Sequence, residues 1–74
     1  MDKTLFYEQM AQILDTDEVN PDNVLKDFET WDSLAVLSVM AMADSKFGVA
    51  IKADEMRSAV TVADLEKMVE GKLK

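Results

Sequence analysis

The sequence lacks both cysteine and histidine, and it has few residues that break or stiffen a chain: two glycines, one proline and five aromatic residues in 74. Without histidine or cysteine it cannot complete a nucleophile–base arrangement of the usual kind, nor can it form a disulfide. Its seven lysines fall at polar, solvated positions, which does not favour a serine–lysine enzyme. We therefore expect no catalytic activity.

Long apolar runs are also missing. The longest mostly apolar stretch, residues 34–43, is too short to cross a bilayer, and the N-terminus has no apolar run of the signal-peptide type. The absence of cysteine is compatible with a reducing compartment. These features predict a soluble cytoplasmic protein with no membrane insertion.

Basic residues are scarce, with eight against fifteen acidic ones and a formal charge of −7. This balance opposes nonspecific binding to nucleic acid, so we expect no nucleic-acid partner and favour partners that carry a basic patch. The plainer alternative is that the charge only keeps a small apolar-rich protein in solution. At this length we expect one domain over residues 1–74, with a thin core and no room for a catalytic cleft.

Apolar periodicity predicts helices over residues 3–14, 33–47 and from Thr61 towards the C-terminus, with one or two turns over 53–58. Phe6, Met10 and Ile13 share one face of the first helix. Thr61 and Asp64 resemble a capping box, and Gly48 is placed to end the second helix. The prediction is an all-α fold, a small four-helix bundle with three main helices, one short third helix and a long first loop.

That first loop, residues 15–32, contains Phe28 and Trp31, which a freely solvated linker would not need, so we expect it to be tied to the core. An EF-hand would need an oxygen ligand and then a glycine where this loop has Val19 and Asn20. We therefore predict no metal site. The loop carboxylates considered as ligands are Asp15, Asp17, Glu18 and Asp22.

The helix predicted over residues 33–47 has two apolar stripes. The first, assigned to the core, comprises Val36, Val39, Met40, Ala43 and Phe47. The second comprises Leu34, Leu37 and Ala41, and it is displaced by roughly a third of a turn at 100° per residue. Either the loop covers the second stripe through Phe28 or Trp31, or partner proteins dock there, and its position beside Ser33 favours docking.

Ser33 stands where this helix begins. The unpaired backbone N–H groups and the positive end of the helix dipole favour a phosphate ester at such a hydroxyl. Nothing in the sequence activates Ser33 as a nucleophile. We interpret it as a site of modification.

Three segments together resemble the acyl carrier protein family. They are residues 31–34 (Trp-Asp-Ser-Leu), residues 47–51 (Phe-Gly-Val-Ala-Ile) and the pair Thr61 and Val62. The resemblance implies that a phosphopantetheinyl transferase attaches the 4'-phosphopantetheine of coenzyme A to Ser33. The terminal thiol of that arm would hold an acyl group as a thioester, so the reactive sulfur comes with the prosthetic group. Other enzymes load and accept the acyl group, and the carrier performs no bond chemistry itself.

The resemblance also implies a docking surface around Ser33, in which acidic residues form a rim about the apolar contact. The expected partner-binding residues are Asp32, Leu34, Leu37, Ala41, Asp54 and Glu55. After Ser33 the helix has only Asp44 as an acid, offset by Lys46, which favours a specialised lipid or secondary-metabolite pathway over general fatty acid biosynthesis. We expect a monomer. A freestanding aminoacyl or peptidyl carrier, an unmodified interaction module in which the serine region only caps a helix, and serine phosphorylation remain alternatives.

Overall fold

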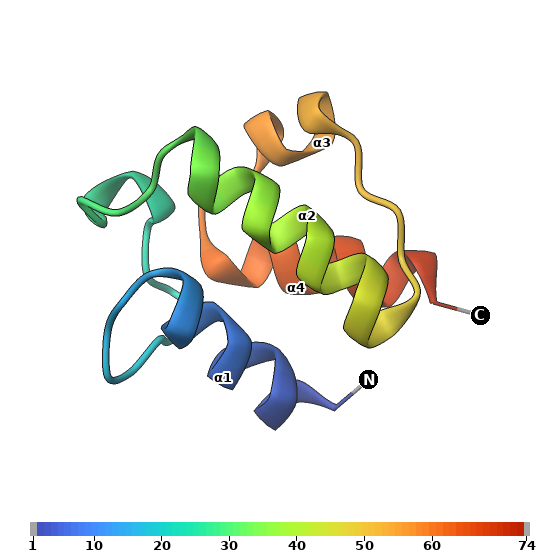
Figure 1. Cartoon of the computed structure of the whole chain (residues 1–74), viewed down its shortest axis with the longest axis horizontal. Helices are drawn as coiled ribbons and strands as arrows, with labels where there is room; N and C mark the ends of the chain where they lie inside the picture. Colours follow the sequence, from blue (N-terminus) through green and yellow to red (C-terminus); the bar gives the residue numbers. More distant parts are fainter. Residues whose placement is uncertain (1, 74) are drawn as a thin grey trace.

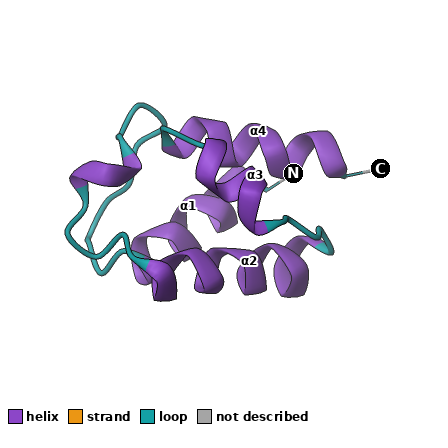
Figure 2. Cartoon of the chain, turned by 90° about the horizontal axis from the view of Figure 1, so that it is seen from above, coloured by secondary structure: helices purple, strands orange, loops and turns teal. Residues whose placement is uncertain are grey.

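The computed structural model describes residues 2–73 and contains four α-helices in that range. They are α1 (Lys3–Ile13), α2 (Ser33–Phe47), α3 (Ala53–Ser58) and α4 (Val62–Lys72), and a single 3₁₀ turn, Leu25–Asp27, lies in the first loop. Figure 1 shows the loop joining α1 to α2 at one end of the molecule and α3 at the top of the view, and in Figure 2 α2 and α4 run along opposite sides. The predicted all-α four-helix bundle is confirmed, and α1 ends one residue earlier than expected.

The core lies between the three long helices and is closed by residues from the connections. Leu14 continues the buried row of α1 after Phe6 and Met10, whereas Ile13, which we had placed in that row, is only half-buried. The spacing of four residues from Met10 to Leu14 keeps the row on one helix face. The buried apolar residues are Phe6, Met10, Leu14, Val19, Leu25, Ala35, Val39, Met42, Ala43, Val49, Ile51, Met56, Ala59, Val62, Leu65 and Val69.

The core-facing side of α2 was predicted incorrectly in part. The structure buries Ala35, Val39, Met42 and Ala43, while Val36, Met40 and Phe47 are half-buried at the edge of the core. At 100° per residue the buried face is rotated by about a fifth of a turn from the predicted one. The predicted stripe included Met40 and Phe47 and left out Ala35, but small residues such as alanine fit where a helix approaches its neighbours most closely.

The first loop is tied to the core through Phe28 and Trp31, as predicted, and it is also hydrogen-bonded to the connection between α3 and α4. The Leu25 N–H donates to the Val60 carbonyl at 2.9 Å, and the Val62 N–H donates to the Asn23 carbonyl at 3.0 Å. Farther along, the Thr30 hydroxyl donates to the Leu14 carbonyl at 2.7 Å. These long-range bonds fix the end of the loop that leads into α2, and they therefore position the start of that helix.

Local capping explains where the helices begin and end. Gly48 ends α2 in the left-handed conformation at φ 65°, which glycine adopts without a Cβ penalty. Before α4, the Asp64 N–H donates to the Thr61 hydroxyl, and the Asp64 carboxylate accepts from the Val60 and Thr61 N–H groups at 2.9 and 3.0 Å. These backbone bonds, that from Thr61 first, lower the pKa of Asp64. The predicted capping box is confirmed.

Candidate phosphopantetheine site

Asp32 and Ser33 divide two tasks at the start of α2. Asp32 is the N-cap, and its Oδ1 accepts a hydrogen bond from the Ala35 N–H at 2.9 Å. Ser33 is the first residue of the helix and is exposed. Because Asp32 supplies the cap, the Ser33 hydroxyl is not needed to satisfy the helix end and remains available for modification.

The first N–H groups of a helix have no acceptor within that helix. In α2 the Ala35 N–H is satisfied by Asp32, which leaves those of Ser33 and Leu34 at the solvent-exposed end, next to the serine hydroxyl. These donors and the helix dipole favour a negative charge at this end of the helix. The site therefore suits a phosphate ester on Ser33, as the sequence suggested.

A groove of about 330 Å³ opens beside Ser33, between α2 and α3. This volume is near the lower end of the range of small-molecule sites in proteins. Four of its six lining residues are apolar: Val36, Leu37, Met40 and Ala53. The other two are Ser33 and Arg57. Sequence reasoning missed Arg57, although its position four residues after Ala53 places both on one face of α3.

The second apolar stripe of α2 is open to solvent. Leu34 is 73% exposed and Leu37 is 60% exposed, and Ala41 is exposed as well. Phe28 and Trp31, which could have covered the stripe, instead pack against the hydrophobic core cluster. Exposed leucines next to Ser33 form an apolar surface of the kind that partner proteins use.

The two acidic residues expected at the rim in α3 differ in their surroundings. Asp54 is exposed. Glu55 forms an ion pair with Lys72 at 3.1 Å and accepts a hydrogen bond from the Lys52 N–H at 3.2 Å. The hydrogen bond from the Lys52 backbone, together with Lys72, lowers the pKa of Glu55. The Glu55 carboxylate thus already has partners within the chain, whereas Asp54 remains open to outside contacts.

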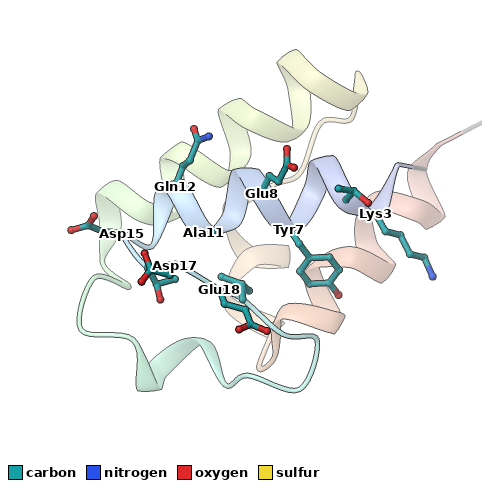
Figure 3. Close-up of a pocket in the computed structure, with 11 residues that line it drawn as sticks. Lys3, Tyr7, Glu8, Ala11, Gln12, Asp15, Asp17 and Glu18 are labelled. Atoms are coloured by element: carbon teal, nitrogen blue, oxygen red, sulfur yellow. The ribbon is translucent and has the colours of Figure 1, made fainter.

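A larger open groove of about 950 Å³ lies along α1 and the segment that follows it (Figure 3), and it shares no lining residue with the groove beside Ser33. Glu8, Asp17 and Glu18 make it acidic, and the Tyr7 ring extends from α1 towards α4. The Tyr7 hydroxyl is buried without a hydrogen-bond partner in residues 2–73. Burial first, and then the nearby carboxylates of Glu66 and Glu70, raise the pKa of Tyr7.

Within residues 2–73 no three acidic side chains come together in a way that could hold a metal ion. Over the same residues, none of the helices has the length and apolar character needed to cross a membrane.

Comparison with known proteins supports a carrier. A family model described as the phosphopantetheine attachment site matches residues 5–69. Three curated acyl carrier proteins are similar over 58 residues, or 78% of this chain. Those from Micrococcus luteus and Myxococcus xanthus are both 34% identical, with 72% and 73% of their own lengths covered. The third, from Beutenbergia cavernae, is 36% identical with 71% of its length covered.

The fold has a close match as well. A solved chain described as a candidate acyl carrier protein from Mycobacterium tuberculosis superposes with a TM-score of 0.81. The match covers 93% of this chain and 95% of the other. At 24% identity it shows similarity of fold alone.

An all-helical bundle with an exposed serine at a helix start thus coincides with a family match over most of the sequence. The chain belongs to the acyl carrier protein family. Its domain binds 4'-phosphopantetheine, and it acts as a carrier, not as an enzyme.

Proposed function

We propose that this chain carries an acyl group as a thioester on a 4'-phosphopantetheine arm attached to Ser33, and that it delivers the group to partner enzymes. The observation that carries the proposal is the free, exposed Ser33 hydroxyl at the first position of α2, relieved of capping by Asp32 and adjacent to a groove. The family match supplies the identity of the group. When bound, the arm provides the thiol that the chain itself lacks.

The residues near Ser33 fit this group. The open N–H groups at the start of α2 suit the phosphodiester, and the apolar wall formed by Val36 and Met40 offers a dry surface for the uncharged part of the arm. Asp32 fixes the helix start and thus the position of the serine. The protein's contribution is to hold, orient and present the arm to other enzymes.

The partners we propose are a phosphopantetheinyl transferase and the enzymes that load and accept the acyl group. We place their contact on the exposed stripe of α2, with polar contacts at its edge. The mostly apolar character of this stripe favours docking through side-chain burial over docking through charge. The proposed contact residues are Asp32, Leu34, Leu37, Ala41, Asp54 and Glu55.

The low charge of α2 favours one class of pathway over another. After Ser33, the only charged residues of α2 are Asp44 and Lys46, so the helix offers almost no net charge to a basic partner. This supports a specialised lipid or secondary-metabolite pathway. We place the carrier in the cytoplasm and expect it to work as a monomer. A freestanding aminoacyl or peptidyl carrier is the second candidate, because the exposed leucines would serve its partners equally well.

Attachment can be tested with coenzyme A and a broad-specificity phosphopantetheinyl transferase, followed by intact mass measurement. The wild type should gain one phosphopantetheinyl group, and Ser33→Ala should gain none. Ser38→Ala is the matched control, because Ser38 is an exposed serine on the same helix. If the wild type stays unmodified while an established carrier is converted, the chain would instead be an unmodified helical interaction module.

The cargo requires protein from the native host. Fragmentation of the modified Ser33 peptide should eject the arm together with what it carries, and the added mass identifies the acyl group. An amino acid or peptide on the arm would establish the second candidate. A phosphate without pantetheine would show that Ser33 is a phosphorylation site.

A further inference from the structure

Arg57 is the only arginine in the sequence, and it lines the groove that Ser33 also lines. It lies in the last turn of α3, 24 positions along the chain from the serine. The fold therefore brings a permanent positive charge to the place where a covalently attached phosphate would enter.

Within the described part of the chain, no acidic side chain forms an ion pair with Arg57. Over residues 2–73 there is one ion pair within 4.0 Å, and it joins Lys72 to Glu55. The groove has no acidic lining residue, since its remaining walls are Ser33, Val36, Leu37, Met40 and Ala53. Asp32, the acid next to Ser33, already accepts the Ala35 N–H.

We propose that Arg57 binds the phosphodiester of the arm on Ser33 and holds the start of the arm in the groove between α2 and α3. A guanidinium presents a planar set of donors that matches two phosphate oxygens at once. Both Ser33 and Arg57 are exposed, so solvent screens the pair and the expected contribution is that of a surface ion pair. The inference rests on the proposed function, because it requires an arm at Ser33.

A second role for Arg57 must be separated from this one. A cation in the last turn of a helix interacts favourably with the carbonyl end of that helix, and Arg57 has this position in α3. That effect stabilises the unmodified and modified proteins equally. A contact with the phosphodiester stabilises only the modified form, so the difference between the two forms reports the proposed interaction.

The experiment compares unmodified and phosphopantetheinylated forms of four proteins: wild type, Arg57→Gln, Arg57→Lys and the control Lys46→Gln. Lys46 is an exposed cation at the far end of α2, about 20 Å from Ser33 at 1.5 Å per residue. The measurements are the midpoint of thermal unfolding at low and high salt, and the ³¹P chemical shift of the phosphodiester. Neither depends on loading a cargo or on a partner enzyme.

In the wild type, modification should raise the unfolding midpoint by about 2–5 °C at low salt, and high salt should reduce this gain. Arg57→Gln should abolish the gain and move the ³¹P signal towards that of free pantetheine phosphate esters. Arg57→Lys should retain part of the gain because it keeps the charge but loses the planar fork. Lys46→Gln should behave as the wild type.

An equal gain in wild type and Arg57→Gln, with an unchanged ³¹P signal, would overturn the proposal. Failure of the wild type to accept the arm would remove the proposed function itself. A modified wild type without an Arg57 effect removes this inference alone.

Discussion

Replacing Asp32 with alanine should destabilise the protein without removing the acceptor of the arm. The change deletes the hydrogen bond from the Ala35 N–H to Oδ1, which is 2.9 Å long and caps α2. Loss of an N-cap side chain costs about 1 kcal/mol, within a range of about 0.5–2 kcal/mol. For a domain of this size, about 1 kcal/mol lowers the midpoint of thermal unfolding by about 4–8 °C.

Two further variants isolate the cause. Asp32→Asn keeps a side-chain oxygen that can cap the helix, so its midpoint should stay within about 2 °C of wild type. Ser33→Ala should also stay close to wild type, because Ser33 makes no capping bond and alanine is the better helix former. Circular dichroism melts of the unmodified proteins give the midpoints.

Intact mass after transferase treatment measures a second property, the ability to accept the arm, and the two variants should change places in it. Asp32→Ala should still accept one phosphopantetheinyl group when folded, whereas Ser33→Ala should accept none. The division of tasks would be refuted by a stable Asp32→Ala together with a Ser33→Ala midpoint lowered by about 4–8 °C, since that result would make Ser33 the cap.

Three further outcomes follow from burial, titration and exposure. Phe6→Ala should lower the free energy of unfolding in urea by about 3–5 kcal/mol and Phe47→Ala by less, because Phe47 is only half-buried; equal losses would contradict the packing. The lowered pKa of Asp64 stabilises the fold above about pH 4, and this contribution is lost as the pH falls through the unfolded and then the folded pKa. Melts from pH 7 to 3 should therefore show the deficit of Asp64→Asn shrinking in acid, and a constant deficit would argue against the bond. Leu37→Glu should weaken binding to a cognate enzyme by about 1–3 kcal/mol and Asp44→Asn by under about 1 kcal/mol; a steep salt dependence with the reverse order would restore docking through charge.

Short-range chemistry made the helices and their ends predictable from sequence. The cap of Asp32 on Ala35 and the capping box of Thr61 and Asp64 each span three residues, so their geometry depends on the local chain alone. Gly48 likewise ends α2 through its own backbone conformation. Apolar periodicity placed Ser33 at the start of a helix before any packing was known, and the structure adds that Asp32 is the residue that caps it.

Packing decided which faces those helices present. The pattern of α2 placed Phe47 in the core and gave little weight to Ala35, yet Ala35 is buried and Phe47 is half-buried. Apolar residues cover most of this helix, so periodicity defines a broad face and not its centre. The centre depends on how closely the other helices approach, which is a property of the folded bundle.

The groove beside Ser33 is likewise a product of tertiary structure. Ser33 and Arg57 come together because the segment after Gly48 returns the chain to the start of α2, where α3 then lies. No local pattern encodes that approach, since it depends on the burial of Val49, Ile51 and Met56 in the common core. The sequence by itself determined the helix that presents the serine, and only the fold decided which side chains surround it, because local hydrogen bonds act over a few residues whereas packing joins distant ones.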